Sequence, residues 1–203
     1  MRPGMRLKTH WFRDATPRDP EQIANAMSSI VWRSADARVR NLRKGNFEIA
    51  AGPHYLQILV EILVFLSVVA DRIALRYQTP EWRAAFTQAL VGRVGDLLQD
   101  SFDDLLGPAP GGGYRKRFIG RFNIRVAEYG EFEYHEHGPE FALLRLFGDL
   151  LTQAMPEAED QRWALDQAMT VEGPECVDVV EKSMRGLLGL EPRPARRAGE
   201  PGE

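Results

Sequence analysis

Cysteine is almost absent from this chain of 203 residues, since Cys176 is the only one. An internal disulfide is therefore excluded, and a chain of this length can bury a sufficient core without one. No charged, apolar and small-residue signal segment opens the sequence. We therefore expect a cytoplasmic protein. Cys176 itself follows Gly-Pro-Glu near an expected helix start, where a helix dipole can lower a thiol pKa, but a lone cysteine there is more often a packing residue.

Lysine is scarce as well, with 4 residues against 22 arginines. This bias indicates a GC-rich bacterial genome through codon usage. The net charge is −3, but residues 1–44 hold ten Lys/Arg against four Asp/Glu, so that this part carries +6 and the rest −9. Such asymmetry favours contacts within one molecule or between subunits. The overall acidity argues against nucleic acid as the partner.

A membrane-spanning run is also lacking. The longest apolar segment is 55–70, YLQILVEILVFLSVVA, and Glu61 lies near its middle. A membrane span needs about 20 largely uncharged apolar residues. The segment therefore predicts a central core helix over 53–78 and no membrane contact.

The remaining pattern predicts an all-α protein: one domain, 19–190, in which six or seven helices pack around helix 53–78. Cap-plus-proline signals at Asp19-Pro20, Gly52-Pro53 and Thr79-Pro80 mark three helix starts. Residues 107–113, GPAPGGG, predict a flexible connector between two halves of the bundle. Two shorter helices are expected at about 157–170 and 175–188. An irregular N-terminal arm over 1–18 and a disordered tail over 191–203 complete the chain.

The segment 114–137 is ambiguous. Phe118, Phe122, Val126 and Tyr129 recur at helical spacing, whereas Phe122, Ile124 and Val126 also alternate with polar residues as in a strand. We expect a helix. A small β-hairpin over 121–134, turning near Tyr129-Gly130, is the alternative.

Helix 53–78 is apolar on all sides in its middle, because Val64, Phe65 and Val68 interrupt its one polar stripe. Large apolar patches usually mark interfaces. Either other helices of the chain or a second subunit must cover these three residues. We expect a homodimer that uses them.

Metal-ligand motifs are absent: the chain has no Glu-x-x-His and no His-Glu-x-x-His. Glu133 and Glu136 project onto the aromatic face of the 114–137 helix if that helix continues so far. Together with Glu61 they form the one candidate site for a divalent metal or a carboxylate pair. The simpler reading is that Glu61 reaches water at a helix edge and that Glu133 and Glu136 are exposed acids.

Catalytic motifs are absent too, whether nucleophile elbow, P-loop or dinucleotide fingerprint. We therefore expect a helical protein-interaction or regulatory protein that has no catalytic activity, no resident cofactor and a protein partner of unknown identity. The alternative is a metal-binding or carboxylate-based enzyme whose site lies between helix 53–78 and segment 128–137. Nucleic-acid binding through the basic cluster 33–44 is third, because neither a helix-turn-helix nor an aromatic platform accompanies it.

Overall fold

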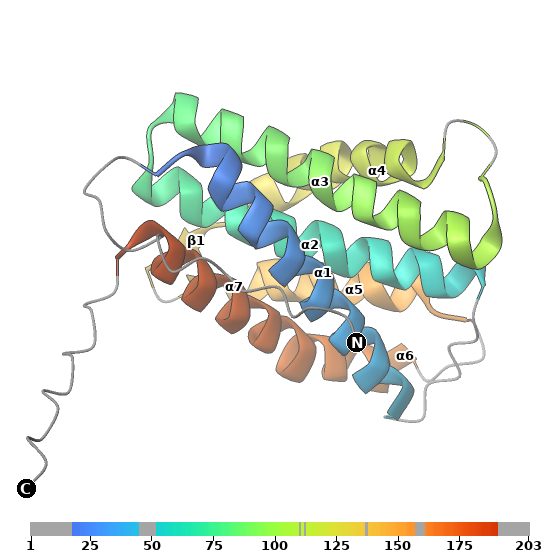
Figure 1. Ribbon diagram of the computed structural model, residues 1–203. Coiled ribbons are helices and arrows are strands. Elements are labelled where there is room, and N and C mark those ends of the chain that lie inside the picture. The colour runs from blue at the N-terminus through green and yellow to red at the C-terminus, as the bar shows by residue number, and fades with distance from the viewer. Residues whose placement is uncertain are drawn as a thin grey trace, which may run out of the picture.

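The computed structural model describes residues 18–44, 52–109, 111, 113–136, 138–156 and 161–190, and it confirms the all-α fold (Figure 1). The predicted tail, and all of the predicted arm except Arg18, lie outside the described residues. The elements in chain order are α1 (Pro20–Lys44), α2 (Pro53–Tyr77), α3 (Pro80–Leu106), α4 (Gly113–Gly130), β1 (Tyr134–His135), β2 (Gly138–Pro139), α5 (Phe141–Ala154), α6 (Gln161–Gln167), the π-helix η2 (Ala168–Glu172) and α7 (Gly173–Leu188).

The predicted helix starts are confirmed, and each has a local cause. The carboxylate of Asp19 accepts a hydrogen bond from the backbone N–H of Glu21 at 3.1 Å. Thr79 caps α3, because its hydroxyl accepts from the backbone N–H of Trp82 at 3.3 Å. Proline then occupies the first helical position, where its missing N–H costs no hydrogen bond.

Helix α2 is the centre of the fold, as its apolar sequence predicts. It contacts α1, α3, α4, α5 and α7. Figure 1 shows α2 running through the middle of the bundle, with α1 crossing in front of it and α3 and α4 above it. Among the described residues, no helix is both long and apolar enough to cross a membrane.

The ambiguous segment is helical up to Gly130, so the alternative hairpin over 121–134 is wrong. Phe118, Phe122 and Tyr129 of α4 are all buried, and only a helix places residues at this spacing on one face. A minimal hairpin follows instead, in which Tyr134 pairs with Pro139 and His135 pairs with Gly138.

The last helices form one continuous run from Gln161 to Leu188, and not the two separate helices that the sequence predicts. Proline breaks a helix interior, but it is tolerated in the first turn. Pro174 lies in the first turn of α7, directly after the π-helix η2. Residues 157–160, where the first of the two was expected to begin, lie outside the described residues.

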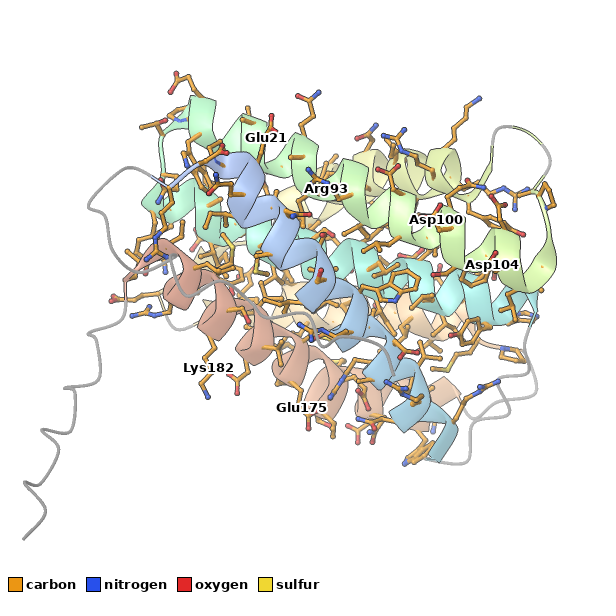
Figure 2. All side chains as sticks on the ribbon, in the orientation of Figure 1. Glu21, Arg93, Asp100, Asp104, Glu175 and Lys182 are labelled. Atoms are coloured by element: carbon orange, nitrogen blue, oxygen red, sulfur yellow. The ribbon has the colours of Figure 1, made fainter. Side chains whose placement is uncertain are left out.

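Charged side chains cover the outside of the bundle. Figure 2 shows Arg93 and Asp100 of α3, and Glu175 and Lys182 of α7, on the outside of their helices. All four are exposed. Such residues are solvated, so a candidate site must be sought where polar side chains are buried or line a concavity.

Candidate functional site

The predicted interface residues are not on the surface. Val64 and Phe65 have no exposed area within the single chain, and Val68 is 1% exposed. The ring of Phe65 stacks on Phe147 of α5, with 4.1 Å between ring centroids, and also contacts Tyr129 of α4. The prediction of a subunit interface at these residues is therefore wrong. The chain's own helices cover them.

Glu61 is buried as well, at 5% exposure, so it does not reach water at a helix edge. Arg125 of α4 donates to both of its carboxylate oxygens, through Nε and Nη2, each at 3.1 Å. The Nε of Arg121 lies 3.5 Å from Oε1 of Glu61. Burial disfavours the charged form of Arg125, but its hydrogen bonds to Glu61 and Glu128 outweigh that effect and raise its pKa.

Glu133 and Glu136 do not join Glu61. Both follow the end of α4 and are exposed, with the Glu133 side chain at 78%. Arg76 of α2 donates to the backbone oxygens of Tyr134 and His135, at 3.1 and 2.7 Å, and so holds this segment beside itself.

Arg76 is 15 residues beyond Glu61, which is about 22 Å along the helix axis. A metal site made of Glu61, Glu133 and Glu136 is therefore wrong for this fold. No group of three metal-ligating His, Cys, Asp or Glu side chains occurs in the part of the chain that the structure describes.

A second buried carboxylate on α2, Asp71, was not singled out from the sequence. It is 2% exposed. Arg83 of α3 donates to both oxygens, at 2.9 and 2.6 Å, and the Thr87 hydroxyl donates to Oδ1 at 2.5 Å. The hydrogen bond to Asp71 raises the pKa of Arg83. The sequence contains one signal for this pairing. In a helical hairpin that turns at Gln78-Thr79, residue 71 of the first helix faces the part of the second helix that begins at Arg83.

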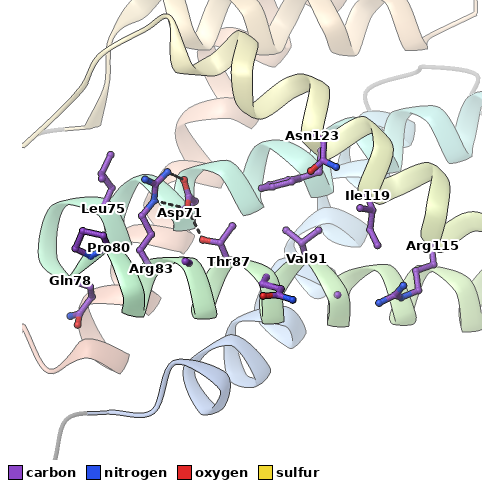
Figure 3. Close-up of a pocket in the computed structure, with 14 residues that line it drawn as sticks. Asp71, Leu75, Gln78, Pro80, Arg83, Thr87, Val91, Arg115, Ile119 and Asn123 are labelled. Atoms are coloured by element: carbon purple, nitrogen blue, oxygen red, sulfur yellow. Dashed lines mark hydrogen bonds and ion pairs between the residues drawn. The ribbon is translucent and has the colours of Figure 1, made fainter.

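This Asp71–Arg83–Thr87 cluster lies at one end of a concavity formed by the described residues, which we call the α3–α4 cleft (Figure 3). The cleft has a volume of about 800 Å³. It lies between the end of α2, α3 and α4. The residues that line it are Asp71, Leu75, Gln78, Pro80, Arg83, Ala84, Thr87, Gln88, Val91, Gly92, Arg115, Ile119, Phe122 and Asn123.

The middle of the cleft is apolar and its walls are polar. Val91 and Phe122 are buried at 7% and 5% exposure, and Ile119 is half-buried beside them. Gln88 of α3 and Asn123 of α4 also line the cleft, one from each helix. Each amide offers one hydrogen-bond donor group and one acceptor.

Arg115 lies at the opposite end from the Asp71 cluster (Figure 3). Its Nε donates to Oδ1 of Asp96 at 2.6 Å, and both side chains are about half exposed or more, at 48% and 60%. It packs across Gly92 and Gly95 of α3. A larger residue at either position would occupy space beside the Arg115 side chain. Exposed pairs of this kind contribute little to stability, so Arg115 can exchange its partner at low cost.

The basic cluster 33–44 is engaged within the molecule where it is described. Arg38 pairs with Glu172 of η2 at 3.3 Å and with Glu175 of α7. Arg40 pairs with Asp36, and the Arg43 guanidinium lies 5.5 Å from the ring centroid of Tyr55. The contacts of Arg38 and Arg43 bind α1 to the rest of the bundle, whereas the Arg40–Asp36 pair lies within α1. Glu172, buried at 1% exposure, is a third internal carboxylate that the sequence did not reveal.

Cys176 is a packing residue. It is 1% exposed, and burial raises the pKa of its thiol to about 12. A thiol with so high a pKa is a poor nucleophile, because the thiolate is the reactive form.

Comparison with known proteins adds nothing to this picture: no protein family matches the chain, and neither curated proteins nor solved structures gave a match. The chemistry therefore has to be argued from the site itself. Glu61 and Asp71 accept from arginine at both oxygens, so the positions that a metal ion would take are occupied by guanidinium groups. The α3–α4 cleft combines apolar surface, amides and a weakly held guanidinium, which is a set of groups suited to binding.

Proposed function

We propose that the protein is a non-catalytic, helical binding protein that holds a short apolar, acid-ended segment of a protein partner in the α3–α4 cleft. The observation that supports it best is the combination of an apolar middle at Val91, Ile119 and Phe122 with amide side chains on both walls. A polypeptide carries one N–H and one C=O per residue. Gln88 and Asn123 can pair with both kinds of group while apolar side chains of the partner enter the middle.

The length of the cleft limits the number of partner residues that it can hold. Arg83 and Gly92, over which Arg115 lies, are nine residues apart in α3, or about 14 Å along the helix. An extended chain rises about 3.3 Å per residue. About four residues therefore span the distance between the two arginines.

The charged residues of the cleft determine at which end of it the acidic residue of the partner segment binds. Within the described part of the chain, the Arg115 guanidinium is bound only through Nε, to an exposed aspartate. Its other N–H groups can therefore bind a carboxylate of the partner. Arg83, by contrast, is fixed by two hydrogen bonds to buried Asp71. We expect the acidic residue of the partner at the Arg115 end, since a guanidinium matches a carboxylate in geometry and charge.

The homodimer and the cytoplasmic and bacterial assignments remain predictions. The residues predicted to form the dimer interface are buried within the chain, so self-association would need other residues. The cytoplasmic location rests on the single cysteine, and the bacterial source rests on the arginine bias.

Selection from a library of random peptides on the purified full-length chain tests the proposal. The peptides recovered should be four or five residues long in their shared motif, apolar in the middle and acidic at one end. Affinity is then measured by fluorescence anisotropy with three variants. Gly92→Leu fills the cleft, because a Cβ there meets only the end of Arg115, at 3.7 Å. Arg115→Met removes the charge. Gly186→Leu on α7 is the matched control, since a Cβ there meets nothing within 4 Å.

We expect Gly92→Leu to weaken binding at least tenfold and Gly186→Leu to leave it unchanged. Arg115→Met should weaken the binding of acidic peptides. It should not weaken the binding of the same peptides when the acidic residue is replaced by its amide. Equal affinity of the wild type and Gly92→Leu would overturn the proposal, as would a library that yields no peptide.

A further inference from the structure

A second concavity, the α2–α4 pocket, lies on the other side of α4. Its volume is about 480 Å³, and α2 and α4 line it with Leu56, Val60, Glu61, Tyr114, Arg121 and Ile124 among others. At 100° per residue, the α4 residues that line this pocket face away from those that line the α3–α4 cleft. The two concavities are therefore separate sites with α4 as the wall between them.

The inner surface of the pocket is apolar. Val60 and Tyr114 are 8% and 5% exposed, and Leu56 is half-buried beside them. The Tyr114 hydroxyl donates to the backbone oxygen of Gly107 at 3.1 Å, so its polar atom is already satisfied. Ile124 is 55% exposed at the rim. An apolar body that enters the pocket would bury this surface, worth about 25 cal/mol for each Å² removed from water.

The charged groups at the pocket favour an anion. Glu61 faces it, but both of its oxygens already accept from Arg125. Arg121 is 44% exposed, with its Nε held 3.5 Å from Glu61, and Arg117 is exposed one turn earlier on α4. Arginines one turn apart on a helix can reach one ligand. Among the charged residues that line the pocket, the two guanidinium groups of Arg117 and Arg121 outnumber the one carboxylate, that of Glu61.

We propose that the α2–α4 pocket binds an amphipathic anion, which is a carboxylate or phosphate monoester on an apolar body. The acid group lies between Arg117 and Arg121, and the body lies over Val60 and the ring of Tyr114. Glu61 lies 3.5 Å from Nε of Arg121 at the rim. This proposal is independent of the function assigned to the α3–α4 cleft.

Gly120 supplies the decisive variant. It lines the pocket, and a Cβ added there meets no atom of the described residues within 4 Å. A leucine at this position therefore fills the pocket without disturbing its neighbours, and it replaces a helix-interior glycine by a better helix former. Gly120→Leu should melt no lower than the wild type, so a loss of binding in this variant reports on the site and not on unfolding.

The test is isothermal titration of the full-length chain with four eight-carbon probes: octyl phosphate, octanoate, octylammonium and 1-octanol. The two anions should bind, with octylammonium and 1-octanol at least tenfold weaker. Gly120→Leu should abolish anion binding, and Arg117→Gln with Arg121→Gln should weaken it at least tenfold. Gly92→Leu and Gly186→Leu should bind as the wild type does.

Absence of anion binding would overturn the proposal, and so would equal binding of octylammonium or unchanged binding by Gly120→Leu. A co-sedimentation arm separates two sources of the ligand. Co-sedimentation with vesicles that contain phosphatidic acid, lost in Gly120→Leu and absent with phosphatidylcholine alone, assigns the anion to a lipid headgroup. Binding of octyl phosphate without co-sedimentation assigns it to a free small molecule.

Discussion

Glu61 and Asp71 lie ten residues apart on the same buried helix, and each accepts two hydrogen bonds from one arginine of another helix. The guanidinium fork matches a carboxylate in both geometry and charge. The two carboxylates lie at different concavities. Glu61 faces the α2–α4 pocket, and Asp71 faces the α3–α4 cleft. At the scale of single residues, Asp71 holds Arg83 at the edge of the α3–α4 cleft, and Glu61 lies 3.5 Å from Arg121 at the edge of the α2–α4 pocket.

Glu61→Gln should lower the free energy of unfolding by about 3 kcal/mol, because removal of one partner from a buried ion pair leaves the other charge poorly compensated. Urea unfolding followed by circular dichroism measures this change. Glu133→Gln is the matched control: its side chain is 78% exposed, so a change of no more than about 0.5 kcal/mol is expected. A Glu61→Gln variant as stable as this control would show that the pair does not matter to the fold.

Cys176 predicts a dependence of stability on pH. Burial raises the thiol pKa from 9.0 to about 12, so the unfolded chain releases this proton at lower pH than the folded chain does. The stabilisation is complete below pH 9 and is lost as the pH rises towards 12. Between pH 8.0 and 9.5 the free energy of unfolding should fall by about 1 kcal/mol more in the wild type than in Cys176→Ala, because the unfolded-state pKa lies near 9. Parallel pH profiles of the two proteins would contradict this.

The sequence identified Glu61 as unusual but not its partner. Arg125 is 64 positions away, and the i, i+3 spacing on its own helix pairs it with Glu128, a contact that the structure also contains. The pairing with Glu61 depends on how α2 and α4 cross, and that crossing is set by packing of the whole core. Glu133 and Glu136 were misplaced because the prediction extended α4 beyond Gly130.

At the scale of elements, helix starts were predictable because caps and prolines act locally. The continuous run from α6 through η2 to α7 was not, because Gly173-Pro174 resembles a break in sequence alone. Two glycines show what packing adds. Gly120 of α4 faces open space, whereas a Cβ at Gly148 of α5 would lie 2.8 Å from both Leu165 and Met169.

The two glycines therefore predict opposite effects. Gly120→Ala should raise the free energy of unfolding by up to about 1 kcal/mol, because alanine is the better helix former and nothing opposes it. Gly148→Ala should lower it by about 1–2 kcal/mol, since α5 and the α6–η2 region would have to move apart. Thermal melts of both variants beside the wild type provide the measurement. Stabilisation by Gly148→Ala would contradict the close packing of α5 on this region.

At the scale of the whole molecule, α2 is covered on every side by helices of its own chain. The all-round apolar sequence in the middle of α2 predicts complete burial, and the structure agrees. The sequence alone does not show whether the chain's own helices or a second subunit cover this surface. That decision depends on the tertiary arrangement of α4, α5 and α7 around α2.

Phe65→Ala should therefore destabilise the protein without changing its assembly. Phe65 is fully buried and stacks on Phe147, so the cost should be about 3–5 kcal/mol. The folded fraction should sediment at the same rate as the wild type at equal concentration. A wild type that sediments as a dimer and a Phe65→Ala variant that sediments as a monomer would restore the predicted interface.

The central claim is that the α3–α4 cleft holds a peptide segment, and the side-chain amide signals of the isotope-labelled protein test it most directly. During titration with a selected peptide, the NH₂ resonances of Gln88 and Asn123 should shift, because both line the cleft. Those of Gln57, in the α2–α4 pocket, and of exposed Gln153 on α5 should stay in place. Shifts at Gln57 or Gln153 with none at Gln88 and Asn123 would contradict the account.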